Sequence, residues 1–286
     1  MIALTVALAV LVGISLGLLG GGGSILTVPL LAYVAGMDAK QAIATSLLVV
    51  GTTSAVAAVS HARAGRVQWR TGLIFGMAGM AGAYGGGLLA RFIPGSVLLI
   101  GFALMMIATA IAMLRGRKDV GPADPHHCIP VPKVILEGLV VGLVTGLVGA
   151  GGGFLVVPAL ALLGGLPMPI AVGTSLVVIA MKSFAGFAGY LSSVTIDWKL
   201  AGMVTVAAVV GALIGARLTA LINPDSLRKA FGWFVLVMSS VILFEEAHPA
   251  IGIAMAVLTV VAAAVYHLRG RRSGDTPAGT LAEVKH

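Results

Sequence analysis

The chain has 286 residues, of which 59% are hydrophobic and 10% charged, and its mean hydropathy is +1.08. A soluble domain of this size cannot bury so much apolar surface, so the composition excludes one and indicates a polytopic membrane protein. The net charge of +8 does not indicate nucleic-acid binding, because the basic residues lie mostly in short loops between apolar runs. The single cysteine, Cys128, excludes a disulfide framework.

Apolar runs follow one another along the chain, at residues 2–36, 41–60, 71–92, 96–114, 134–165, 170–191, 200–221, 231–246 and 250–267. Most are close to the ~20 residues that a helix needs to cross ~30 Å of hydrocarbon. The first and the fifth runs are too long for one ordinary span, and each contains a glycine cluster in its middle. The polar, proline-rich stretch 115–133 predicts a linker between two halves.

The two halves are copies of one another. The segment GLLGGGGSILTVP at 17–29 matches GLVGAGGGFLVVP at 146–158 in eight of thirteen positions, an offset of 129 residues. The same offset continues without a gap for about seventy residues, and it pairs Ser54 with Ser183 and Trp69 with Trp198. We therefore predict an internal duplication.

The positions of lysine and arginine indicate how the two copies are oriented. If each long run crossed the membrane once, the loop charges would divide eight to seven between the two sides. If the two long runs instead enter and return as hairpins broken at their glycines, the charges divide twelve to three, so we predict the hairpins. The three on the minority side are Lys40, Arg91 and Lys199.

This layout predicts an all-α membrane protein of two inverted repeats. Each repeat is expected to be a glycine-broken helical hairpin plus three transmembrane helices, with one extra C-terminal helix. The expected parts are a first repeat over 1–114, a cytoplasmic linker over 115–133, a second repeat over 134–246, the extra transmembrane helix over 247–268 and a cytoplasmic tail over 269–286. Inverted repeats with interrupted helices are typical of secondary transporters, whose site lies at the repeat interface.

The glycine clusters indicate an anion site. A return half-helix that begins near Ser24 or Gly153 points free N–H groups and about half a positive charge into the membrane. Glycine lets a ligand approach that backbone closely, and two such ends from opposite leaflets would bind an anion. The backbone candidates are Gly21, Gly22, Gly23 and Ser24, with Gly151, Gly152 and Gly153 in the second half. The alternative is that these glycines only allow close helix packing.

Lys182 lies at the middle of the run 170–191, where a charge costs at least ~2.5–3.5 kcal/mol and indicates function by default. No acidic residue occupies the centre of any run, so an anionic ligand or helix C-terminal carbonyls would supply the counter-charge. The counterpart of Lys182 in the first half is Thr53, which predicts an asymmetric site. The alternative is a structural lysine that is paired with carbonyl groups.

Hydroxyl groups near the start of two runs complete the candidate site: Thr45, Ser46, Thr174 and Ser175. They are expected either to donate hydrogen bonds to an oxyanion or to bond back to the carbonyl four residues earlier. His126, His127 and Cys128 are weak metal candidates, because adjacent residues rarely reach one ion together. We predict no metal, no cofactor and no enzyme activity, since the sequence has no nucleophile–base arrangement, Walker loop or Rossmann fingerprint.

The two glycine clusters with Pro29 and Pro158, and the tripeptides Ala44-Thr45-Ser46 and Gly173-Thr174-Ser175, resemble the TauE/SafE family of sulfite and organosulfonate exporters. The resemblance covers about residues 5–267, with Ala150 as a departure where the first copy has Gly21. It implies transport of small sulfur-containing or carboxylate anions across the bacterial cytoplasmic membrane. The expected partners are the anion and membrane lipid, without nucleic acid, and a homo-oligomer is left open.

We therefore expect a multi-pass protein of the inner (cytoplasmic) membrane that exports small anions. The acidic residues lie at the ends of the apolar runs, which predicts no obligatory proton coupling. A cell interior that is negative expels anions without such coupling. The alternative, from a different class, is a non-transporting membrane subunit that binds a partner protein or lipid through its glycine-rich faces.

Overall fold

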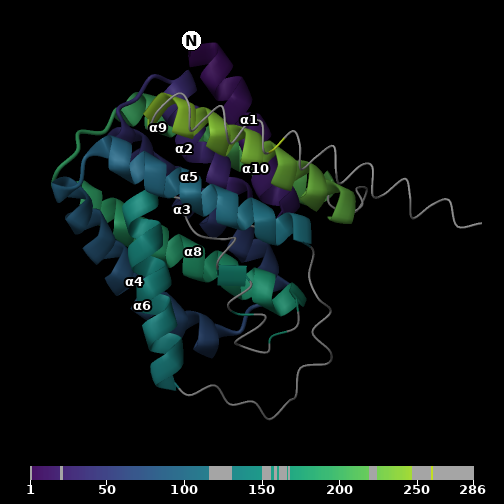
Figure 1. Cartoon of the computed structure of the whole chain (residues 1–286). Coiled ribbons are helices and arrows are strands. Elements are labelled where there is room, and N and C mark those ends of the chain that lie inside the picture. Colours follow the sequence, from purple (N-terminus) through teal and green to yellow (C-terminus); the bar gives the residue numbers. More distant parts are fainter. Residues whose placement is uncertain are drawn as a thin grey trace, which may run out of the picture.

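The computed structural model describes residues 2–19, 22–115, 131–149, 156–157, 160, 166, 168–218, 224–246 and 259. Every regular element in these ranges is a helix (Figure 1). Four of them are long and apolar enough to cross a membrane, over Ala39–Arg63, Trp69–Phe92, Ile170–Tyr190 and Trp198–Leu218, and shorter apolar helices accompany them. The protein is therefore a multi-pass membrane protein, helical throughout the residues described, as its composition predicts.

The long helices of the two halves correspond in order and in bounds, to within two residues at their ends. The first half contains α1 (Ile2–Leu19), η1 (Gly22–Leu26), α2 (Thr27–Pro29), η2 (Leu30–Val34), α3 (Ala39–Arg63), α4 (Trp69–Leu89), η3 (Ala90–Phe92) and α5 (Gly95–Arg115). The second contains α6 (Val131–Val148), α8 (Met168–Tyr190), α9 (Trp198–Leu218) and α10 (Pro224–Glu246). With the offset of 129, α1 corresponds to α6, α3 to α8, α4 to α9 and α5 to α10.

Several expected segments lie wholly or partly outside the described residues. Helix α6 already begins at Val131, within the stretch 115–133 that the sequence predicts as a linker. The rest of that linker over 116–130, which includes the metal candidates His126, His127 and Cys128, is not among the described residues. The same holds for the tail over 269–286 and for the predicted helix over 247–268 apart from Thr259.

Both long apolar runs break at their glycine clusters, as predicted. Helix α1 ends at Leu19 and α6 ends at Val148, so each stops directly before the first glycine of its cluster. Gly149 follows α6 with φ +75°, a left-handed conformation that glycine adopts without steric cost. Its N–H donates to the Thr145 carbonyl at 2.9 Å, which is the geometry of a helix C-terminal cap.

In the first half the chain folds back after the break. The segment resumes as the 3-10 helix η1, continues through the single turn of α2 and widens into the π-helix η2 directly after Pro29. Proline lacks an N–H and its ring crowds the carbonyl four residues earlier, so Pro29 interrupts the regular helical hydrogen-bond pattern of this segment. A straight continuation would carry Leu30 about 16 Å beyond Leu19. Instead η2 contacts α1, so the segment returns along it.

Small residues let helices of opposite halves pack backbone against backbone, α1 against α9 and α4 against α6. The glycines at these contacts face a main-chain carbonyl of the neighbouring helix, with no room for a Cβ. Each contact recurs with its two partners exchanged between the halves. The pairs are Gly13–Ala208 with Gly142–Gly79, Gly17–Ala212 with Gly146–Ala83, Gly211–Val10 with Gly82–Leu139, and Gly215–Ile14 with Gly86–Leu143.

Helices α3 and α8 lie side by side and run in opposite directions. Near the start of α3, the Gln41 side-chain amide donates to the carbonyl of Thr195, just beyond the end of α8 (3.1 Å). Farther along, Gly51 lies against the Phe184 ring. Near the end of α3, Gly173 packs against the His61 Cβ. Residue numbers therefore rise along α3 as they fall along α8. Helices α5 and α10 also pack side by side (Figure 1).

Candidate functional site

Lys182 lies on α8 and is 1% exposed. Its ammonium nitrogen has no hydrogen-bond partner within the described part of the chain. The side chain passes Gly79 of α4, where a Cβ in place of the glycine hydrogen would lie 3.8 Å from the Lys182 Cβ and 3.9 Å from its Cδ. Glycine therefore leaves the space that the aliphatic stem occupies. A buried ammonium without a partner is strongly unfavourable, so a counter-charge or several acceptors are expected beside it.

Three further polar side chains lie at the same level of the α3–α8 contact. Gly51 of α3 faces Phe184 of α8, so the residues just after Gly51 and just before Phe184 share one depth. We call these residues the central polar layer: Thr53, Ser54, Lys182 and Ser183. All four are at most 2% exposed.

The members of the central polar layer differ in how their polar atoms are satisfied. The Thr53 hydroxyl donates to the carbonyl of Val49 (2.8 Å), within its own helix. The hydroxyls of Ser54 and Ser183 have no partner among the described residues, like the Lys182 ammonium. These two serines are repeat counterparts in the sequence, but the predicted site did not include them. The sequence could have identified them by their position, because they directly follow the predicted site residues Thr53 and Lys182.

The motif Thr45-Ser46 lies closer to the start of α3. The Ser46 hydroxyl donates to the carbonyl of Gly149 at 3.0 Å, so it reaches the glycine cluster of the other half. Thr45 is fully buried and its hydroxyl has no partner among the described residues. Thr45 precedes Thr53 by eight residues, which is about 12 Å along a helix. The motif therefore lies to one side of the central polar layer.

The corresponding motif Thr174-Ser175 lies on the other side of that layer. The Thr174 hydroxyl accepts a hydrogen bond from the Gln68 N–H (2.9 Å), in the loop before α4. The Ser175 hydroxyl donates to the carbonyl of Val172 in its own helix (2.8 Å). Thr174 precedes Lys182 by eight residues, again about 12 Å. The structure thus spreads the four predicted hydroxyls over two levels and does not gather them around Lys182.

The structure describes only some residues of the two glycine clusters. Gly22 and Gly23 begin η1, and Ser24 in the same 3-10 helix is fully buried and has an interaction partner. Thr27 follows in α2, buried and with an unpartnered hydroxyl among the described residues, and it was not among the predicted site residues. Gly21 and the candidates Gly151, Gly152 and Gly153 lie outside the described residues.

Described residues on either side of the second glycine cluster pack near α3 and α8. Before the cluster, Gly149 contacts Ile43 near the start of α3. After the cluster, Val156 belongs to a buried group that also contains Val178 of α8. Lys182 follows Val178 by one helical turn on the same face.

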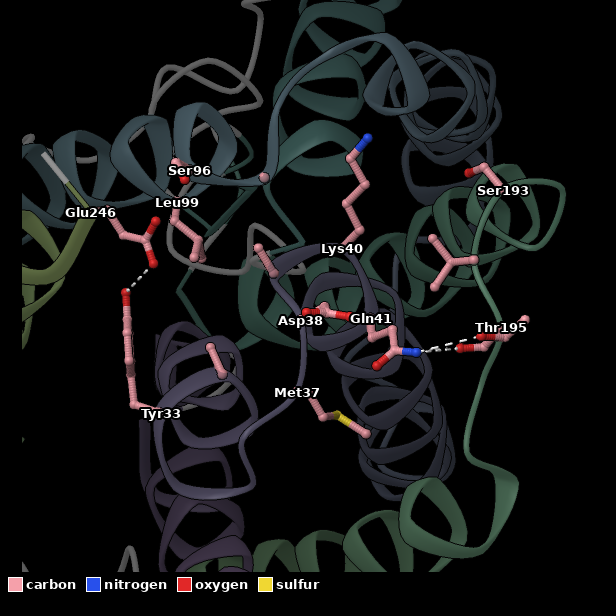
Figure 2. A pocket seen from close by; sticks show the side chains of 14 residues that line it. Tyr33, Met37, Asp38, Lys40, Gln41, Ser96, Leu99, Ser193, Thr195 and Glu246 are labelled. Atoms are coloured by element: carbon pink, nitrogen blue, oxygen red, sulfur yellow. Dashed lines mark hydrogen bonds between the residues drawn. The ribbon is translucent and has the colours of Figure 1, made fainter.

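A polar cavity of about 670 Å³ opens at the end of the molecule where α3 and α5 begin (Figure 2). Several of its lining residues are hydrogen-bonded. The Tyr33 hydroxyl donates to the Glu246 carboxylate (3.3 Å), and the Gln41 amide contacts Thr195. The Lys40 ammonium donates to the carbonyl of Arg91 (3.1 Å). Hydroxyl and charged groups make this cavity polar, unlike the apolar outer surfaces of the helices.

The comparisons with known proteins agree with a helical membrane transporter. The model of the family described as Sulfite exporter TauE/SafE matches residues 5–242. A probable membrane transporter protein of Xylella fastidiosa is 34% identical over 241 residues, which covers 82% of this chain and 92% of that protein. The probable membrane transporter protein YdhB of Bacillus subtilis is 29% identical and covers 82% of this chain and 97% of its own length.

A further relative is a probable membrane transporter protein of Methanocaldococcus jannaschii, 28% identical over 79% of this chain and 90% of its own. No solved structure matches the chain. These similarities show that the protein is a membrane transporter and not an enzyme. The chain belongs to the TauE/SafE sulfite exporter family.

Proposed function

We propose that this protein is a secondary transporter that exports small anions, such as sulfite, organosulfonates or related carboxylates, across the inner (cytoplasmic) membrane. The observation that carries the proposal is the fully buried ammonium of Lys182, without a partner among the described residues, at the middle of a transmembrane helix. A membrane protein tolerates such a charge beside a counter-charge or several acceptors, and a bound anion would supply that counter-charge.

Two inverted repeats would place Lys182 at their interface. The exchanged glycine contacts between the halves are what an approximate two-fold axis produces. The counterpart helices α3 and α8 run antiparallel, so such an axis would lie perpendicular to both, in the plane of the membrane. Thr53 and Lys182 are counterparts at one level of this pair, which is where the axis would pass. Substrate sites near the midplane at such an interface are typical of secondary transporters.

The two glycine clusters would supply the rest of the site. In the first half, Gly22, Gly23 and Ser24 begin the segment that returns along α1. In the second half, Gly151, Gly152 and Gly153 would supply N–H groups from the stretch between Gly149, which contacts α3, and Val156, which shares a buried group with α8. Free N–H groups at both return segments would bind oxygen atoms of the anion, and Lys182 would bind them from one side only. Thr45, Ser46, Thr174 and Ser175 would then line the approaches on the two sides.

Export follows from the electrical driving force. An interior-negative membrane potential drives an anion outward by ~2.3 kcal/mol per charge per 100 mV. The acidic residues Asp38 and Glu246 lie at the polar cavity at the end of the helix bundle, not in the central polar layer. We therefore infer that transport has no obligatory proton coupling.

The test is anion flux in liposomes that contain the purified protein alone. Saturable sulfite efflux that is absent from empty liposomes supports the proposal. Flux that is absent with the protein alone, and appears only when a partner protein is added, favours the alternative of a non-transporting subunit. Binding measurements with sulfite, sulfoacetate, thiosulfate and acetate would then identify the preferred anion.

A further inference from the structure

Ser54 and Ser183 are buried serines whose hydroxyls have no partner in the described part of the structure. A helical serine ordinarily satisfies its hydroxyl by donating to a carbonyl about one turn earlier. Ser239 of α10, which is also fully buried, does this with Leu236 at 2.8 Å. Because an unsatisfied buried hydroxyl costs free energy, two of them at matching positions indicate that something binds there.

Within the central polar layer, each serine lies one helical turn after a buried apolar residue. Ser54 follows Val50 by one turn, and Ser183 follows Ile179 by one turn. Val50 and Ile179 belong to one buried group, together with Val156 of the second half and Val178, the residue one turn before Lys182. Residues one turn apart share a helix face. Ser54, Lys182 and Ser183 therefore each lie one turn beyond a residue of the same buried apolar group.

We propose that Ser54 and Ser183 donate hydrogen bonds to the anion that Lys182 binds, an assignment that rests on the proposed function. Lys182 supplies the charge from the second half only, whereas the serines supply one neutral donor from each half. Ser54 lies on α3 and Ser183 on α8, and these two helices run antiparallel, so the two hydroxyls reach the site from different helices. They would therefore bind different oxygen atoms of one small oxyanion. The occupied site would satisfy all three orphaned groups at once.

The test compares Ser54→Ala and Ser183→Ala with Ser239→Ala as the matched control, using sulfite as the probe and calorimetric titration of the purified protein. Each of the first two variants is expected to bind sulfite roughly tenfold more weakly, the effect of losing one hydrogen bond to a charged ligand. Ser239→Ala is expected to bind like the wild type. The Tm of the ligand-free Ser54 and Ser183 variants should stay equal or rise, because the deleted hydroxyl was unsatisfied, whereas loss of a purely structural group would lower it.

Unchanged sulfite affinity in both serine variants, while Lys182→Met has lost binding, overturns this inference and leaves the proposed function in place. A wild type that binds none of sulfite, sulfoacetate, thiosulfate and acetate overturns both. Ser54→Cys and Ser183→Cys provide a second pair, since cysteine keeps the approximate volume with a weaker donor. They should show a smaller loss of affinity than the alanine variants, and wild-type affinity in both would also count against the assignment.

Discussion

The Ser46 hydroxyl in the first half donates a 3.0 Å hydrogen bond to the carbonyl of Gly149 in the second half. The bond joins the Thr-Ser motif of α3 to the glycine that ends α6. Gly149 also lies against Ile43, one turn before Ser46. The two motifs that carry the resemblance to the TauE/SafE family thus meet across the two halves of the chain.

Gly149→Ala should destabilise the protein. The residue has φ +75°, which costs an alanine roughly 1–2 kcal/mol, and its added Cβ would meet the backbone of Ile43. A loss of ~1 kcal/mol in stability lowers the Tm of a chain of this size by about 2–4 °C, so we expect the Tm to fall by at least that amount. Gly101→Ala is the control, because nothing lies within 4 Å of a Cβ at that position of α5. Equal Tm values for the two variants would show that Gly149 is not needed for the turn.

Gly13→Ala and Gly142→Ala should destabilise the protein by similar amounts. They are repeat counterparts, and a Cβ at either would run into a main-chain carbonyl, of Ala208 or of Gly79. Overpacking of this kind costs about 1–3 kcal/mol. Gly202→Ala serves as the control, since its Cβ position is open. Thermal unfolding in detergent checks the prediction, and a loss in only one of the two variants would argue against equivalent packing in the halves.

Lys182→Met should weaken sulfite binding at least tenfold and leave the protein folded, because the deleted charge has no described partner whose loss would cost stability. Lys182→Arg should restore only part of the affinity, since a planar fork replaces a compact ammonium. Lys199→Met, at an exposed position of α9, should bind as the wild type does. Wild-type affinity in the Lys182→Met variant would make Lys182 structural.

Inverted repeats predict that the loop 61–70 and the tail after residue 268 both face the cytoplasm. Cysteines introduced at positions 65 and 274, with Cys128 replaced, can be labelled from outside intact cells with a membrane-impermeant reagent. Neither position should react before the membrane is permeabilised, and both should react afterwards. Labelling of only one position in intact cells would rule out this layout.

Much of the fold follows from the sequence because it depends on local composition. The glycine clusters break α1 after Leu19 and α6 after Val148, where the sequence predicts a break. Apolar length predicts α3, α4, α8 and α9 to within a few residues. The duplication is also visible in the helix bounds, which correspond between the halves.

The contacts of single side chains could not be predicted in the same way. The reach of Ser46 to Gly149 depends on the register between α3 and the end of α6, which are far apart in the chain. The orphaned hydroxyls of Ser54 and Ser183 depend on side-chain rotamers within the helices. Thr53 is the repeat counterpart of Lys182, yet its hydroxyl donates a hydrogen bond to the Val49 carbonyl within its own helix. Sequence spacing gives the level of a residue but not the partner of its polar atom.

Potential-driven export through a site at Lys182 is tested most directly by sulfite movement in proteoliposomes under an imposed potassium-diffusion potential, with wild-type protein and with Lys182→Met. We predict that the potential alone drives sulfite toward the positive side in the wild type, without a pH or sodium gradient, and that the variant loses this flux. The mechanism is contradicted if a pH or sodium gradient alone drives accumulation while the potential has no effect, or if Lys182→Met transports like the wild type.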